Sequence, residues 1–244
     1  MPSAAPQTPR EPKYYPVKRH LLDNIESLSP GSPVPTEREL SAEFGTSRTT
    51  VRQALLELVA EGRLVRRQGS GTYVAEPKMT WPLHLTSFTE QAAANGFTAS
   101  TQLLSAERIR ADDEIAGRLG IEVGAAVFRI ERLRLADECP MAVETAHLSA
   151  TRFPQLTRHL RREPSLYAVL GARYGVVPVS VEESISTAPA SPRESALLNT
   201  DTGAPMLVLA RRSFDQSGAP VEWVTSWYRG DRVTFVANLM RSAP

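Results

Sequence analysis

Two arginines near the middle of the chain have the spacing of an anion-binding pair. In the stretch FRIERLR, residues 128–134, side chains would alternate between the two faces of a strand, so Arg132 and Arg134 share one face. They would lie about 7 Å apart along it. Two guanidinium groups at that distance can bind one phosphate through charge-assisted hydrogen bonds. Arginines on strands also serve in salt bridges, and that structural alternative stays open.

A serine further along the chain has the position of a second anion-binding group. Ser165 is expected to cap a helix over residues 166–174, where its hydroxyl and the N–H groups of Leu166 and Tyr167 would be free to meet an anion. Glu144, on the strand expected to pair with that of Arg132, can accept hydrogen bonds from sugar hydroxyls. The alternative is that Ser165 only caps its helix. The sequence thus indicates a sugar-phosphate site.

A different chemistry is expected near the N-terminus, in a helix that begins at Ser47. The aliphatic residues from Val51 to Val59 recur at helical spacing and would be buried, which turns Arg48, Thr49 and Arg52 to solvent at the start of the helix. In a recognition helix this end enters the major groove. There guanidinium groups bind guanine, while hydroxyl and N–H groups bind phosphate.

The elements around this helix are those of a winged helix-turn-helix. Thr36 and Glu39 form a capping-box pattern, which predicts the start of the second helix. A hairpin follows the third helix, with glycines at its tip and Arg66 and Arg67 before them, as in a wing that approaches DNA closely. The expected helices cover 14–28, 36–44 and 47–62, and the expected hairpin covers 64–74.

Composition limits the remaining possibilities. The chain has 244 residues, of which 41% are hydrophobic, and its net charge of +1 makes no global case for nucleic acid. Cys139 is the only cysteine, which excludes an intramolecular disulfide and a cysteine-based zinc site. No metal or cofactor is expected. The sequence has neither an apolar run of membrane-spanning length nor a leader, so a cytoplasmic protein is expected.

The chain is expected to fold as α+β in two domains. A disordered tail (1–12) would precede a winged helix-turn-helix domain (13–76), a linker (77–82) and a second domain (83–242). In the second domain a helix is expected over 85–95, a hairpin from strands 126–136 and 141–148, and a helix that opens at Ser191. Further strands are expected over 177–187, 206–215, 221–228 and 233–239, in a mainly antiparallel sheet.

The N-terminal motifs resemble those of the winged-helix domain of GntR-family bacterial transcription regulators. The resemblance rests on PTEREL (35–40), SRTTVRQAL (47–55), GRL (62–64) and QGSGT (68–72). It implies binding of operator DNA. Together with the charge of the wing, the DNA-binding residues would be Arg38, Ser47, Arg48, Thr49, Thr50, Arg52, Arg66, Gln68 and Gly69. One short winged helix makes few contacts, so we expect a homodimer that binds an inverted repeat.

The rest of the chain resembles the UTRA effector domain of HutC-type GntR regulators, which is related in fold to chorismate lyase. The likeness is greatest to amino-sugar regulators of the NagR/DasR type, through LTSFTE (85–90), ERLR (131–134), PMAVET (140–145), SLY (165–167), PVEW (220–223) and YRGDR (228–232). It implies an effector of the N-acetylglucosamine-6-phosphate or glucosamine-6-phosphate type. With the N–H groups after Ser165, the expected site is Phe88, Thr89, Arg132, Arg134, Glu144, Ser165, Leu166, Tyr167, Glu222 and Tyr228.

Two other functions remain to be weighed. An enzyme is disfavoured because the four histidines are scattered and Lys78 is the last lysine, which excludes a Schiff-base lysine in the second domain. No catalytic residue is therefore expected. The other possibility is a regulator of the same class with another effector, such as a fatty acid or a histidine-pathway acid. Such an effector would not explain why two arginines lie together on one face.

Overall fold

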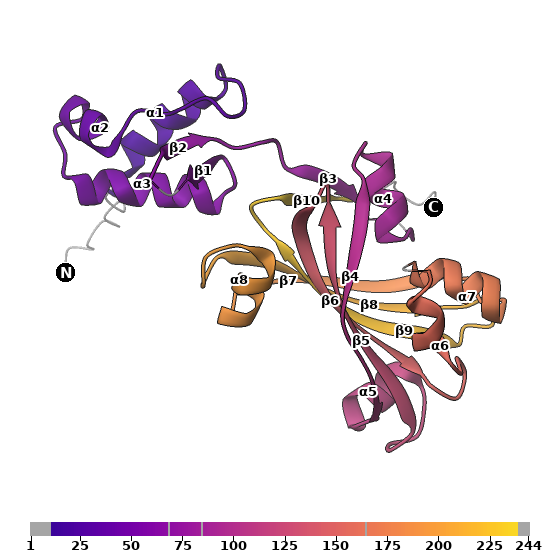
Figure 1. Ribbon diagram of the computed structural model, residues 1–244. Helices are drawn as coiled ribbons and strands as arrows, with labels where there is room; N and C mark the ends of the chain where they lie inside the picture. The colour runs from indigo at the N-terminus through magenta and orange to yellow at the C-terminus, as the bar shows by residue number, and fades with distance from the viewer. Residues whose placement is uncertain (1–10, 68, 84, 164, 239–244) are drawn as a thin grey trace, which may run out of the picture. The chain divides into compact units, whose positions relative to one another are not determined.

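The computed structural model describes residues 11–67, 69–83, 85–163 and 165–238 of the chain (Figure 1). The chain divides into two compact units between Pro77 and Lys78. Each unit has its own hydrophobic core and is described separately. Of the expected tail, residues 1–10 lie outside the described part of the chain.

The first unit has the order of elements expected for a winged helix. Thr36 caps α2 in a complete capping box with Glu39, and the Ser47 hydroxyl accepts a hydrogen bond from Thr50 N–H at the start of α3. Gly62 has a φ of +69°, which lets the chain leave α3 and enter the wing. The elements are α1 (Tyr15–Ile25), α2 (Glu37–Glu43), α3 (Arg48–Ala60), β1 (Leu64–Arg67) and β2 (Gly71–Val74).

One hydrophobic core joins the three helices to the wing. It includes Leu21 of α1, Leu40 of α2, and Val51 and Leu55 of α3, all of them buried, as well as Leu64 at the start of β1. The antiparallel wing pairs Leu64 with Val74 and Arg67 with Gly71. Because the inner face of α3 is fixed in this way, its polar N-terminal face is exposed to solvent.

The second unit is built on a six-stranded antiparallel sheet with strand order β4-β5-β6-β9-β8-β7. This confirms the α+β class and the mainly antiparallel sheet. Its strands are β4 (Ala99–Arg110), β5 (Ala126–Ala136), β6 (Cys139–Ser149), β7 (Ser180–Pro189), β8 (Pro205–Phe214) and β9 (Pro220–Arg229). Its helices are α4 (Phe88–Ala94), α5 (Asp113–Leu119), α6 (Leu156–Leu160), α7 (Leu166–Tyr174) and α8 (Pro192–Leu198).

Helices cover both faces of this sheet. On one face, α6 and α7 pack against Ile130 and Val224, and α4 packs against Ala142 and Tyr228. On the other face, α5 packs near Val127. On that face α8 packs against strand residues whose side chains point away from those of Ile130 and Ala142. The face under α4, α6 and α7 is the one that carries Arg132, Arg134 and Glu144, as the alternation predicted.

A short parallel ladder corrects the linker expected at 77–82. Met79–Pro82 forms β3 and pairs with β10 (Val233–Val236), with Trp81 opposite Phe235. Trp81 is fully buried against Phe88 and Tyr228. Most of the expected linker is therefore part of the second unit, because burial of Trp81 and pairing with a strand near the end of the chain hold it there.

The helix expected from residue 85 begins later, at Phe88. Ser87 and Glu90 form a capping box: the Ser87 hydroxyl accepts from Glu90 N–H at 3.2 Å, and the Glu90 carboxylate accepts from Ser87 N–H at 2.8 Å. This reciprocal cap places the helix start one residue after Ser87. Residue 239 of the expected last strand lies outside the described residues.

Candidate effector cavity and DNA-binding face

A cavity lies on the sheet face under α4, α6 and α7, between the strands and the first turns of α4 and α7. All ten residues expected to bind an effector line it, and they come from β5, β6, β9, α4 and α7. The fold thus brings together residues as far apart in the sequence as Phe88 and Tyr228. That these residues bind an effector stays a prediction.

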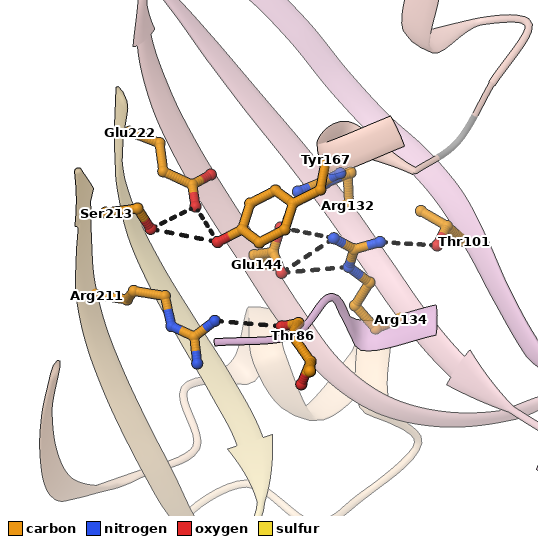
Figure 2. A network of polar contacts seen from close by, with 9 residues as sticks. All are labelled: Thr86, Thr101, Arg132, Arg134, Glu144, Tyr167, Arg211, Ser213 and Glu222. Carbon is orange, nitrogen blue, oxygen red and sulfur yellow. Dashed lines mark hydrogen bonds and ion pairs between the residues drawn. The ribbon is translucent and has the colours of Figure 1, made fainter. Parts of the chain in front are cut away.

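Glu144 is the counter-ion of both arginines. It lies directly opposite Arg132 in the β5–β6 pairing and accepts a hydrogen bond from Arg132 Nη2. Arg134 donates to the same carboxylate through Nε at 3.2 Å and Nη2 at 2.9 Å, and its Nη1 donates to Thr101 Oγ1 at 2.9 Å. Figure 2 shows Arg134 held between Glu144 and Thr101. Glu144 was expected to accept from sugar hydroxyls, but its carboxylate is engaged by arginines here.

The electrostatics of this group favour an ionised Glu144. Burial alone would raise the pKa of its carboxyl, but the positive charges of Arg132 and Arg134 and their hydrogen bonds hold the pKa well below its usual range. All three residues are less than 10% exposed. Because both arginines contact the buried carboxylate, it fixes their positions. Its negative charge neutralises one of their two positive charges.

Arg132 differs from Arg134 because two of its nitrogen atoms have no hydrogen-bond partner in the described part of the chain. Its Nε and Nη1 are buried and have no hydrogen-bond partner among the described residues. Buried donors nearly always have a partner, so each unpaired donor needs an explanation. Thr86 Oγ1, which belongs to another residue of the cavity lining, is buried and unpaired in the same way. These atoms are suited to a ligand with acceptor oxygens.

A second buried carboxylate lines the same cavity. Glu222 accepts hydrogen bonds from Tyr167 Oη at 2.7 Å and from Ser213 Oγ at 2.9 Å (Figure 2). Burial raises the pKa of the Glu222 carboxyl, although these two hydrogen bonds act in the opposite direction. Burial also raises the pKa of the Tyr167 hydroxyl, which is therefore a donor at neutral pH. The site offers carboxylate and hydroxyl groups suited to polar groups of a ligand.

Sequence reasoning missed other polar residues of the lining, among them Thr86, Glu183 and Arg211. Arg211 of β8 donates from Nε to Glu183 of β7 at 2.8 Å. It also donates from Nη1 to the carbonyl of Thr86 at 3.5 Å (Figure 2). Arg211 lies opposite Val224 in the sheet, so the alternation that identified Arg132 also places it on the cavity side. The segment before α4 is thereby tied to the sheet.

Ser165 takes the position expected for it. It is the N-cap of α7, and its hydroxyl accepts from Ala168 N–H at 3.3 Å. The N–H groups of Leu166 and Tyr167 belong to the first turn, where a helix has no internal partner for them. Ser165, Leu166 and Tyr167 all line the cavity that contains Arg132.

The face expected to bind DNA is exposed on the first unit. Ser47, Arg48, Thr49 and Arg52 of α3 are exposed, and Thr50 is half-buried beside Ser47. Arg38 of α2, Arg66 of the wing and Gly69 at its tip are exposed as well. Gly69 has a φ of +71°, a conformation that suits glycine in a tight wing turn. Gln68, which was expected to touch DNA, lies outside the described residues.

Two of the arginines on this face are not free. Glu37, at the first position of α2, accepts from Arg52 Nε at 3.0 Å and Nη2 at 2.8 Å, and from Arg66 Nη2 at 2.7 Å. The periodicity of α3 predicted only that Arg52 faces solvent. An acidic partner on the preceding helix could not be read from that pattern.

Two family models cover most of the chain. Residues 13–74 match the bacterial regulatory proteins of the gntR family, and residues 94–234 match the UTRA domain. The chain belongs to the gntR family of bacterial regulatory proteins. It carries the UTRA domain that the resemblance to HutC-type members implied.

Named relatives of this GntR regulator agree with the assignment. It is 41% identical over 229 residues to the HTH-type transcriptional repressor PhnF of Mycolicibacterium smegmatis (strain ATCC 700084 / mc(2)155), covering 94% of this chain and 93% of the relative. It is 38% identical over 234 residues to the HTH-type transcriptional repressor NagR of Bacillus subtilis (strain 168), covering 94% and 96%. The crystal structure of PhnF from Mycobacterium smegmatis superposes with a TM-score of 0.67 at 40% identity, covering 93% and 100%.

These relationships make the chain a DNA-binding transcription regulator of the repressor type and not an enzyme. The UTRA domain supports a small-molecule ligand for the second unit. In the described part of the chain, no group of three or more His, Cys, Asp or Glu side chains could hold a metal ion. No helix among the described residues is long and apolar enough to cross a membrane.

Proposed function

We propose that this repressor binds palindromic operator DNA and that a phosphorylated amino sugar, such as N-acetylglucosamine-6-phosphate or glucosamine-6-phosphate, controls its affinity. The unpaired buried N–H groups of Arg132 carry this proposal. They would bind the phosphate together with Ser165 and the N–H groups of Leu166 and Tyr167. Arg134 would hold Glu144, and through it Arg132, in place.

The other polar groups of the cavity suit the sugar. Glu222 and Tyr228 also line the cavity and would orient the hydroxyl or amino groups of the ring. Phe88 and Thr89 begin α4, where their first-turn N–H groups would bind a further phosphate oxygen. An uncharged apolar effector would leave Arg132 unpaired, so we disfavour it. Another small anionic metabolite is the alternative.

A thermal-shift panel tests the effector class. Glucosamine-6-phosphate or N-acetylglucosamine-6-phosphate at one hundred times its Kd should add about 2.7 kcal/mol to the free energy of unfolding. N-acetylglucosamine without phosphate should give no shift at the same concentration, since Arg132 would have no anion to bind. A shift from the unphosphorylated sugar equal to that from the ester would contradict the proposed phosphate site.

We also propose that the regulator acts as a homodimer on an inverted repeat. The reason is the small recognition surface of one winged helix, which two-fold symmetry doubles. Sedimentation of the full chain on a duplex selected from a random pool should show two chains for each duplex. One chain for each duplex at saturation would rule the dimer out.

Replacing Arg48 by alanine is expected to weaken binding to the selected duplex by about 1–3 kcal/mol and to relax specificity at one base pair. Arg48 is exposed at the first turn of α3 and can reach a guanine edge. Arg67→Ala, on the wing, should instead weaken binding to all duplexes and flatten the salt dependence. Gel shifts with both variants would separate these outcomes, and unchanged affinity for folded Arg48→Ala would refute the assigned face.

A further inference from the structure

Glu37 connects three elements on the proposed DNA-binding face. It lies at the start of α2, and its carboxylate binds Arg52 of α3 through two hydrogen bonds and Arg66 of β1 through one. The side chain of Glu37 is 21% exposed, whereas those of Arg52 and Arg66 are 56% and 43% exposed. We propose that Glu37 is a specificity-determining residue, which orients Arg52 for base contact and suppresses sequence-independent attraction to phosphate.

The geometry of the ion pair leaves Arg52 able to read a base. A guanidinium group has two forks of N–H donors, one formed by Nε with one terminal nitrogen and one formed by the two terminal nitrogens. Glu37 occupies the first fork, through Nε at 3.0 Å and Nη2 at 2.8 Å. The second fork points away from the carboxylate and matches guanine O6 and N7. Glu37 therefore fixes the direction of the fork that reads the base.

The charge of Glu37 acts on all DNA sequences alike. Hydrogen bonds from Arg52, together with the charges of Arg52 and Arg66, keep the pKa of Glu37 below its usual range, so the carboxylate is ionised at neutral pH. It cancels one of the two neighbouring positive charges and repels phosphate. Each cation that neutralises a phosphate adds about 0.9 to the salt slope of binding. Glu37 should thus lower affinity for arbitrary duplexes while leaving base contact intact.

The test compares two glutamate-to-glutamine variants of the full chain. Glu37→Gln keeps the size of the side chain but removes its charge. The matched control, Glu43→Gln, removes the same charge from the other end of α2, where Glu43 contacts His20 and neither arginine. The probes are a duplex selected from a random pool by the wild-type chain and a scrambled duplex of the same composition. The readouts are the ratio of the two Kd values and the salt slope.

For Glu37→Gln we expect binding to the scrambled duplex to tighten about threefold and the salt slope to steepen by about 1. The specificity ratio should fall about tenfold, because Arg52 loses its fixed direction. Glu43→Gln should keep the wild-type ratio within about twofold. Equal ratios for the two variants, with equal salt slopes, would overturn the role of Glu37.

This inference rests on the proposed DNA-binding face, and Arg52→Ala separates the two. If Arg52→Ala lowers the specificity ratio and Glu37→Gln does not, the face stands and the role of Glu37 is wrong. If Arg52→Ala also leaves the ratio unchanged, the assignment of Arg52 to the base-reading face fails, and the role of Glu37 fails with it. Melting temperatures of all three variants control for folding.

Discussion

Replacing Arg132 by methionine should abolish the response to a phosphorylated amino sugar and leave effector-free DNA binding unchanged. The variant keeps an unbranched side chain of similar length but loses every N–H donor. Hydrogen bonds to a charged group contribute about 1.5–3 kcal/mol each, so the loss of two to a phosphate should weaken binding at least about a hundredfold. Isothermal calorimetry with the ligand found by the thermal-shift panel measures this directly.

The fold should tolerate this change. Glu144 keeps the hydrogen bonds from Nε and Nη2 of Arg134, so the variant leaves no unpaired buried carboxylate. Arg129→Met is the matched control, because Arg129 lies on the same strand and its side chain points to the opposite sheet face. The control should bind the ligand as the wild type does. Wild-type ligand affinity in folded Arg132→Met would remove Arg132 from the site.

The ten residues that the sequence singled out all line one cavity, but their contacts there were not predicted. Alternation along β5 placed Arg132 and Arg134 on one face, and the structure agrees. Whether Glu144 lies opposite Arg132 depends on the register of the hairpin, which is set by its two-residue turn at Asp137 and Glu138 together with the shift in pairing between Arg134 and Leu135. A register shifted by two residues would keep the same side chains on the same face of the sheet, so alternation alone does not distinguish these registers. The pattern could therefore place Glu144 near the site but not as counter-ion to both arginines.

Contacts between distant segments explain the other differences. Met79–Pro82 has only four residues and ends in proline, so it was not recognised as a strand, and its partner β10 follows about 150 residues later. The ion pair between Glu37 and Arg52 joins two helices across the turn between them, and its residues are 15 positions apart in the sequence. Caps at Thr36, Ser47 and Ser165 were predicted correctly because each depends only on residues within one turn.

Replacing Trp81 by leucine should uncouple the ligand from DNA affinity. Trp81 lies three residues after Lys78, where the second unit begins, and is fully buried. Its ring packs at 5.0 Å from that of Phe88 and at 5.4 Å from that of Tyr228, measured between centroids. Both of these partners line the candidate effector cavity. A ligand that changes the position of either partner therefore acts directly on β3, the strand that follows the DNA-binding unit in sequence.

The expected size of the effect follows from linkage. A ligand changes operator affinity only if it binds one arrangement of the protein better than another, and couplings of about 1–3 kcal/mol correspond to roughly 5- to 150-fold. Leucine fills part of the space but cannot transmit a displacement of Phe88 through ring contact. In Trp81→Leu the ratio of operator Kd values with and without ligand should therefore approach one, while ligand still binds.

A control must show that a loss of stability alone does not produce this result. Trp→Ala in a core costs about 3–5 kcal/mol, and Trp81→Leu should cost less because leucine retains part of the buried area. Phe153→Leu serves as the control: Phe153 is equally buried, but it packs with Tyr174 near α6 and α7, away from β3. It should lower the free energy of unfolding and keep the ligand response. A Trp81→Leu protein that binds ligand and retains the wild-type ratio would show that the signal leaves the cavity by another path, such as the tie between Arg211 and Thr86.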